Sequence, residues 1–186
     1  MRVIAGAYGG RRLQAPRGQA TRPTADRVRE ALFSILGDID ELSVLDLFAG
    51  SGALGIEALS RGAARAVFVE RAPRALDALR ANLEALGIDR DRADVRALDA
   101  RAAARTALTH GETYDLVFLD PPYRQAAALG RVLSESLAAL LASGGRIVGE
   151  SDRRGPLNLA LPIVDERRYG DTLIRIHEQF PETAGG

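Results

Sequence analysis

The sequence predicts an α/β protein with a mostly parallel seven-stranded sheet, a C-terminal antiparallel hairpin, and a small N-terminal β-hairpin and helix extension. Between residues 43 and 149, short apolar runs alternate with segments whose apolar residues recur at helical spacing, which is the rhythm of βαβ units. Near the end, the strand-like runs 163–168 and 172–176 are joined by only three residues, and so short a joint permits only antiparallel pairing. The 186 residues suit one domain with a sizeable core, so we expect residues 1–186 to form a single domain.

The segment before the sheet is expected to form a basic hairpin arm over residues 1–23 and then one helix. Residues 3–5 and 11–14 are typical of two short strands around a glycine turn at 9–10. Thr24 is predicted as the N-cap of the helix, because its side-chain oxygen can accept a hydrogen bond from a first-turn N–H. Apolar residues at helical spacing continue to Leu36, and Gly37 is expected to end the helix.

The remaining elements follow from apolar runs and from the positions of glycine and proline. Pro73 suits the first turn of a helix, and Gly87 suits its end. Open parallel sheets bind ligands at the carboxyl ends of their strands, so Phe48, Glu70 and Leu119 are expected along one rim. Strands are predicted at 44–48, 66–70, 94–98, 116–119, 146–149, 163–168 and 172–176, and helices at 53–61, 73–86, 100–108 and 126–141.

Charge is balanced over the whole chain but uneven along it. The 25 basic and 25 acidic residues cancel, yet residues 1–29 carry seven arginines against one acid, about +6, which leaves the remainder at about −6. A basic arm on an acidic body indicates a polyanion partner, although a solvated surface without any partner can have the same pattern. We assign the contacts with that partner to Arg11, Arg12, Arg17 and Arg22.

Several residue types are scarce, and this excludes whole classes of chemistry. The chain has no cysteine, which excludes disulfides, cysteine-bound metal and thiol catalysis. With His110 and His177 as its only histidines, it offers little for a histidine metal site or triad, and we expect no metal. No apolar run approaches the roughly 20 residues that span a bilayer, and the N-terminus lacks a signal-peptide pattern. A cytoplasmic protein is the expectation.

A glycine-rich loop follows the first predicted strand of the sheet. Gly50, Gly52 and Gly55 form a G-x-G-x-x-G run, and Glu70 ends the next strand twenty residues after Gly50. Glycines allow the backbone to approach a ligand closely, and a carboxylate at that strand end can bind both hydroxyls of an adenosine ribose. The loop is therefore predicted to bind an adenosine cofactor, and the same run is also found at NAD sites.

Asp120, Pro121, Pro122 and Tyr123 follow the apolar strand 116–119 and form a predicted clamp for a planar amine. The Asp120 carboxylate can accept one N–H of an exocyclic NH2, and the rigid prolines allow the Pro121 carbonyl to accept the other. The Tyr123 ring can stack on a base that has been flipped out of its surroundings. The alternative is a strand ended by proline, with an aspartate that caps the next helix.

Three features favour S-adenosylmethionine over NAD. Asp46 lies at the junction of strand and loop, where dinucleotide sites have apolar residues, and its charge suits the cationic amino-acid end of the cofactor. The chain has too little length for a separate dehydrogenase substrate domain, and the clamp has no role in hydride transfer. Asp99 can accept a hydrogen bond from the adenine amine, cap the helix that follows it, or do both. The expected cofactor-binding residues are Asp46, Phe48, Gly50, Gly52, Gly55, Glu70, Arg71, Asp99, Ala100, Thr24 and Arg27, where Thr24 and Arg27 could equally contact RNA or only pack on the surface.

Four stretches of the chain resemble the bacterial small-subunit (16S) ribosomal RNA guanine-N2 methyltransferases of the RsmD type. They are residues 45–63, 22–30, 119–123 and 169–172, and the resemblance extends over nearly the whole chain. It implies a Rossmann-like class I methyltransferase fold, S-adenosylmethionine as cofactor and the N2 amine of a guanine in ribosomal RNA as the methyl acceptor. It also implies a partner that is the small ribosomal subunit or its RNA, and we expect a monomer.

Four other functions remain open from the sequence. The same clamp serves adenine-N6 methyltransferases on DNA or RNA and glutamine methyltransferases on proteins, although the latter favour Asn where this chain has Asp120. A nicotinamide-dependent oxidoreductase is compatible with the glycine run alone. A non-catalytic RNA-binding assembly factor could keep the fold, and the intact clamp argues against it.

Overall fold

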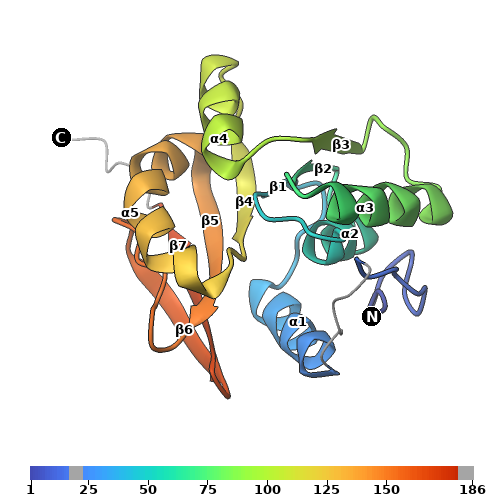
Figure 1. The fold of residues 1–186 in the computed structure, drawn as a ribbon, viewed down its shortest axis with the longest axis horizontal. Helices are drawn as coiled ribbons and strands as arrows, with labels where there is room; N and C mark the ends of the chain where they lie inside the picture. Colours follow the sequence, from blue (N-terminus) through green and yellow to red (C-terminus); the bar gives the residue numbers. More distant parts are fainter. Residues whose placement is uncertain (17–22, 180–186) are drawn as a thin grey trace. The chain divides into compact units, whose positions relative to one another are not determined.

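The computed structural model describes residues 1–16 and 23–179 and shows an α/β fold (Figure 1). Its elements in chain order are α1 (Pro23–Leu36), β1 (Ser43–Asp46), α2 (Ala53–Ser60), β2 (Arg65–Val69), α3 (Pro73–Leu86), β3 (Ala93–Arg96), α4 (Ala100–Thr109), β4 (Tyr114–Leu119), α5 (Tyr123–Leu140), β5 (Leu141–Asp152), β6 (Ile163–Tyr169) and β7 (Thr172–Glu178). By its own contacts the chain divides into two compact units, Met1–Ala100 and Arg101–Gly186.

The strands follow the order β3-β2-β1-β4-β5-β7-β6. Strands β1, β2 and β3 pair in parallel, as do β4 and β5, whereas β7 pairs antiparallel with both β5 and β6. The predicted fold class, a mostly parallel seven-stranded sheet with a C-terminal antiparallel hairpin, is confirmed for the described residues. This is the arrangement of the class I methyltransferases.

In the first unit, the parallel strands β1 and β2 are mostly apolar and buried. Val44 and Leu45 of β1 and Val67 and Phe68 of β2 are buried, as expected for parallel strands that are covered on both faces. Helix α3 begins with Pro73 and turns its leucines at 76, 79, 83 and 86 inward, as predicted. Gly87 ends it in the left-handed conformation at φ 66°, which glycine adopts without a steric penalty.

In the second unit, β4 is buried from residue 116 to residue 119, and β5 lies between β4 and β7. The Tyr169-Gly170-Asp171 joint closes the predicted hairpin of β6 and β7, with Tyr169 opposite Thr172. None of the described helices combines the length and the apolar character needed to cross a membrane.

Two predictions on the N-terminal segment differ from the structure. Helix α1 begins at Pro23, so the N-cap assignment of Thr24 is wrong, because proline fits the first helical position with its fixed φ and missing N–H. The predicted hairpin reduces to one antiparallel bridge between Arg2 and Arg12, since the chain between them turns through Gly6 and Gly10 at positive φ.

Element ends also differ in the sheet. Strand β1 ends at Asp46, so Phe48 lies in the loop that follows instead of on the strand. Strand β5 begins at Leu141, five residues before the predicted start, and absorbs the Gly144–Gly145 turn as an irregularity in its register with β4. Pairing with β4 holds Leu141 and resumes at Arg146, and between them Gly144 keeps a left-handed φ of 74°, so the two glycines form an irregularity within the strand.

Candidate active site

The loop between β1 and α2 contains the three predicted glycines, and each is required for a different physical reason. Gly50 and Gly52 have φ of 55° and 87°, in the left-handed region, whereas Gly55 does not. A Cβ at Gly52 would lie 2.5 Å from Leu79 Cδ1, and one at Gly55 would lie 2.3 Å from Phe68 Cε1. A Cβ at Gly50 would meet no atom within 4 Å. Gly50 therefore serves the backbone turn, and Gly55 serves the close packing of α2 on β2.

Glu70 connects the end of β2 to this loop. Its Oε2 accepts the Gly50 N–H at 2.9 Å, and its Oε1 accepts the Arg71 and Ala72 N–H groups at 2.7 Å each. Three backbone donors thus fix the carboxylate at the mouth of the loop. Because a carboxylate has about four acceptor positions, Glu70 keeps capacity for a hydroxyl donor of a ligand.

Asp46 is the last residue of β1 and lies under the loop, only 1% exposed. Its Oδ2 accepts the Gly55 N–H at 3.2 Å, whereas Oδ1 has no hydrogen-bond partner among the described residues. Burial raises the pKa of Asp46 to about 7, although the backbone amides of Gly55 and Phe48 favour the charged form, and the charge on Glu70 raises it further. A buried acid with one unsatisfied oxygen is suited to a cationic partner.

Asn82 is a residue of this site that the sequence reasoning missed. It is 2% exposed on α3, and its Nδ2 donates to the Ser51 carbonyl at 2.9 Å and to the Gln14 carbonyl at 3.0 Å. Its Oδ1 accepts the Gln14 N–H at 2.7 Å. Asn82 therefore joins the glycine loop to the N-terminal arm. The signal was present, since an asparagine lies within the inward leucine face of α3.

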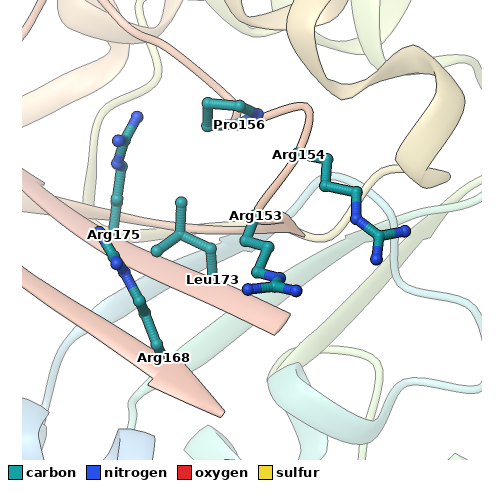
Figure 2. Close-up of a pocket in the computed structure, with 6 residues that line it drawn as sticks. All are labelled: Arg153, Arg154, Pro156, Arg168, Leu173 and Arg175. Atoms are coloured by element: carbon teal, nitrogen blue, oxygen red, sulfur yellow. The ribbon is translucent and has the colours of Figure 1, made fainter. Parts of the chain in front are cut away.

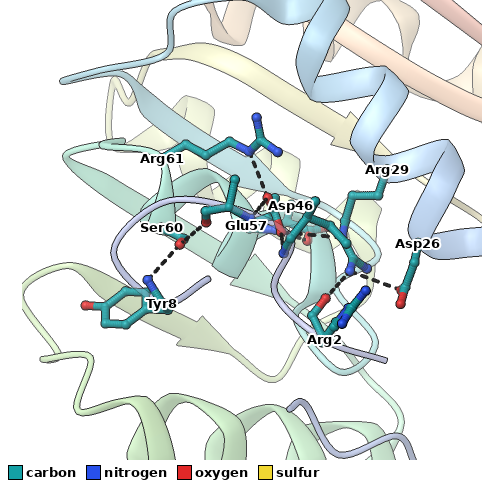
Figure 3. A network of polar contacts seen from close by, with 11 residues as sticks. Arg2, Tyr8, Asp26, Arg29, Asp46, Glu57, Ser60 and Arg61 are labelled. Atoms are coloured by element: carbon teal, nitrogen blue, oxygen red, sulfur yellow. Dashed lines mark hydrogen bonds and ion pairs between the residues drawn. The ribbon is translucent and has the colours of Figure 1, made fainter. Parts of the chain in front are cut away.

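A second polar network attaches the arm to α2, the helix that follows the loop (Figure 3). Glu57 is fully buried, and its carboxylate accepts the Ile4 N–H at 2.7 Å, the Ala5 N–H at 3.1 Å and Arg61 Nε at 2.7 Å. Arg29 Nε lies 3.6 Å from Glu57, and burial lowers the pKa of this guanidinium. A buried carboxylate with this many donors keeps its charge compensated.

The same helix holds the turn of the arm. Ser60 Oγ accepts the Tyr8 N–H at 2.9 Å and donates to the Ala5 carbonyl, while the Ser60 carbonyl accepts the Ala7 N–H at 2.7 Å (Figure 3). The described part of the arm is therefore an integral part of the first unit, bound along α2 and α3.

The predicted RNA-contact arginines are only partly described. Arg11 Nη2 donates to the Ala85 carbonyl at 2.8 Å, so this side chain is used within the first unit, and Arg12 is exposed. Arg17 and Arg22 lie outside the described residues.

The remaining cofactor candidates lie at element ends. Thr24 is inside α1, its side chain is outside the described part, and Arg27 on the same helix is exposed. Arg71 is exposed after β2, and Asp99 is exposed immediately before Ala100, the buried first residue of α4. Of these residues, Arg71 is joined to the Asp46–Gly55–Glu70 group by its backbone N–H, which donates to Glu70 Oε1.

The predicted clamp lies in the second unit, between β4 and α5. Asp120 is exposed, Pro121 is buried, and Pro122 is the exposed N-cap of α5, with φ −52° and ψ 129°. The Pro122 carbonyl accepts the Gln125 N–H at 2.8 Å and so starts the helix at Tyr123, three residues before the predicted start. The prolines thus hold the strand-to-helix turn rigid, while the clamp assignment itself stays a prediction.

The sheet order and the glycine loop define a class I methyltransferase fold, and comparisons with known proteins identify the family. The chain belongs to the family described as conserved hypothetical protein 95, the RsmD family, which matches residues 1–178. YlbH of Bacillus subtilis (strain 168), provisionally named as an rRNA methyltransferase, is 38% identical over 183 residues, covering 96% of this chain and 99% of YlbH. Ribosomal RNA small subunit methyltransferase D of Escherichia coli (strain K12) is 39% identical over 156 residues, covering 81% of this chain and 71% of that protein. The solved structure of a hypothetical protein from a Thermus species is 34% identical, with a TM-score of 0.82, 96% of this chain covered and 99% of that chain.

Proposed function

We propose that the protein transfers a methyl group from S-adenosylmethionine to the exocyclic N2 amine of a guanine in small-subunit ribosomal RNA. The observation that carries this proposal is the buried Asp46 carboxylate, with one unsatisfied oxygen under a glycine loop, in a chain whose relatives are named as rRNA methyltransferases. NAD carries no cationic amino group for that oxygen, whereas S-adenosylmethionine does.

The residues of the first unit fit this cofactor. Asp46 Oδ1 would accept a hydrogen bond from the cofactor ammonium, and Glu70 would accept ribose hydroxyls through its remaining lone pairs. Gly50 and Gly52 make the left-handed turn of the loop and carry no side chains, so the ligand can approach the backbone closely there. When bound, the cofactor supplies an electrophilic methyl group on a sulfonium.

The clamp is proposed to prepare the acceptor amine. Its lone pair is delocalised into the guanine ring, so it is a poor nucleophile. Asp120 and the Pro121 carbonyl would accept its two N–H bonds, favour a more tetrahedral nitrogen and aim the lone pair. Asp120 would stabilise the positive charge that develops on this nitrogen as it takes the methyl group, until the extra proton passes to water. Tyr123 is proposed to stack on the flipped base.

Asp120→Ala tests the proposal. The variant should bind S-adenosylhomocysteine within a few-fold of the wild type, measured by calorimetry, and should lose methyl transfer. Normal methylation by this variant would contradict the clamp assignment. Asn is a weaker test at this position, because its carbonyl can still accept from the amine.

The acceptor is tested by tritiated methyl transfer onto 30S subunits, naked ribosomal RNA and DNA in parallel, followed by nucleoside analysis. N2-methylguanosine from a ribosomal substrate is the expected product. N6-methyladenine as the product would show that the enzyme methylates adenine. Binding of NAD in preference to S-adenosylhomocysteine would contradict the methyltransferase assignment and favour an oxidoreductase.

A further inference from the structure

Four arginines of the second unit gather around one hollow that the function proposed above does not use (Figure 2). It has a volume of about 340 Å³, near the lower end of the ~300–1,000 Å³ of small-molecule sites. We call it the arginine pocket, and its lining consists of Arg153, Arg154, Pro156, Arg168, Leu173 and Arg175. Leu173 is buried and, with Pro156, gives the pocket an apolar wall.

Backbone pairing fixes the segments that carry these side chains. Arg168 on β6 lies opposite Leu173 on β7, and β7 also pairs with β5 up to Asp152. The turn that follows β5 is anchored twice, because the Arg153 N–H donates to the Asp171 carbonyl at 3.0 Å and the Arg154 N–H donates to Asp152 Oδ1 at 2.8 Å. The guanidinium groups therefore extend from a rigid base.

The positive charge of the pocket is only partly compensated. Glu166 accepts Arg168 Nη2 and Arg175 Nε at 2.9 Å each, and Arg153 Nε lies 3.1 Å from Asp171. No ion pair joins Arg154 to a carboxylate in the described part of the chain. The Asp152 carboxylate also lies at this turn, where its Oδ1 accepts the Arg154 N–H, so four cations meet three carboxylates and an excess of positive charge remains.

A phosphate can displace the carboxylates of Glu166 and Asp171 from these ion pairs. The side chains of Arg153 and Arg168 are 53% and 73% exposed, and ion pairs between exposed groups are weak. The flat guanidinium fork matches a phosphate bidentately, and several arginines can share one phosphodiester. The apolar wall of Leu173 and Pro156 offers a surface for the adjoining sugar or base.

We propose that the arginine pocket binds a phosphodiester segment of the substrate RNA, as a contact surface additional to the N-terminal arm. This inference rests on the proposed function, which makes RNA the polyanion. The contact would orient the RNA on the enzyme and would supply no base specificity, since phosphates carry no direct sequence information.

The test is a triple variant, Arg153→Gln/Arg154→Gln/Arg168→Gln. Arg175 is left in place, because it is only 17% exposed and also donates to Asn158, so its loss could unfold the hairpin. The matched control is Arg80→Gln/Arg105→Gln/Arg131→Gln, which removes the same charge from exposed helix positions. The single variant Arg154→Glu reverses the charge of an exposed pocket arginine that makes no ion pair within the described residues, so it breaks no existing salt bridge.

Binding of ribosomal RNA is measured against salt concentration, together with S-adenosylhomocysteine affinity. The triple variant should weaken RNA binding about tenfold or more near 0.1 M salt and flatten the log–log salt slope by about 2, because each phosphate contact contributes roughly 0.7–0.9. Arg154→Glu should weaken RNA binding, while the control triple and the cofactor affinity stay near wild type.

Different results would contradict this inference and the proposed function. If the wild type binds and methylates RNA but the pocket triple keeps the wild-type slope, the pocket has no role. An equal loss in the control triple would also overturn it, since net charge alone would then explain the effect. If the wild type neither binds RNA nor transfers a methyl group to it, the proposed function itself fails.

Discussion

Asp46→Asn should make the free protein more stable at pH 8 while it weakens cofactor binding. Folding moves the pKa of Asp46 from 3.8 to about 7, so the folded state holds this proton more firmly than the unfolded chain. The stability that the protonated carboxyl contributes is complete below about pH 4 and is lost as the pH rises through about 7. Above pH 7 the ionised group costs about 4 kcal/mol, from roughly 1.4 kcal/mol per pKa unit.

Asparagine removes this cost because it does not ionise. Its carbonyl keeps the hydrogen bond from the Gly55 N–H, but its NH2 is a new buried donor that costs about 1–3 kcal/mol when unpaired. The net gain in the free energy of unfolding at pH 8 should be about 1–3 kcal/mol, and it should vanish at pH 4.5. Urea unfolding of the ligand-free protein at both pH values measures it.

The same substitution should weaken cofactor binding, although it stabilises the free protein. Loss of the charged hydrogen bond to the cofactor ammonium, about 1.5–3 kcal/mol, should weaken S-adenosylhomocysteine binding about 10–100-fold at pH 8. Wild-type affinity should fall as the pH drops below about 7, because binding must first remove the Asp46 proton, whereas the variant should lack this dependence. If Asp46→Asn is no more stable at pH 8 and binds the ligand like the wild type, both the buried-charge argument and the ammonium assignment are wrong.

Three further substitutions test how the loop and the arm are held. Gly55→Ala places a Cβ 2.3 Å from the Phe68 ring, so we expect a loss of about 1–3 kcal/mol in urea unfolding, and an unchanged midpoint would show that the ring moves freely. Glu57→Gln removes the buried charge that faces Arg29 and Arg61, leaves Arg29 with Asp26 alone, and should cost about 3 kcal/mol, with faster amide exchange in residues 4–5; normal exchange there would refute the attachment. Asn82→Ala leaves the Ser51 carbonyl without its donor and should weaken S-adenosylhomocysteine binding about fivefold or more, whereas Gln14→Ala, which keeps its backbone bonds, should not. Equal effects of the last two would remove Asn82 from the cofactor site.

Much of the fold was predictable because its signals are local. The apolar runs, Pro73 and Gly87 placed α3 and its neighbouring strands to within about two residues, and the short joint at Gly170 required the antiparallel hairpin. The errors lie at element ends, where a distant pairing partner or a neighbouring residue decides. Strand β5 begins early because Leu141 pairs with Tyr114 ahead of the Gly144–Gly145 irregularity, and helix α1 takes Pro23 as its first residue in place of an N-cap at Thr24.

In the candidate site too, some residues could be predicted from local sequence and others could not. Asp46, the glycine run and Glu70 were predicted from spacing, since residues at the ends of successive parallel strands come near the same edge, and hydrogen bonds join both acids to the loop. Asn82 and Glu57 were missed, because their partners Gln14 and Ile4 lie 68 and 53 residues away in the chain.

By itself the sequence determined the alternation of strands and helices, the place of the glycine loop and the chemistry that Asp46 and Glu70 can offer, because periodicity and turn residues act over a few positions. The tertiary structure alone decided that Asp46 is buried with one unsatisfied oxygen, that the arm is attached through Glu57 and Asn82, and that two arginines of the C-terminal hairpin and two of the turn after β5 line one hollow. Burial and long-range hydrogen bonding depend on which segments pack together, and that information is spread over the whole chain.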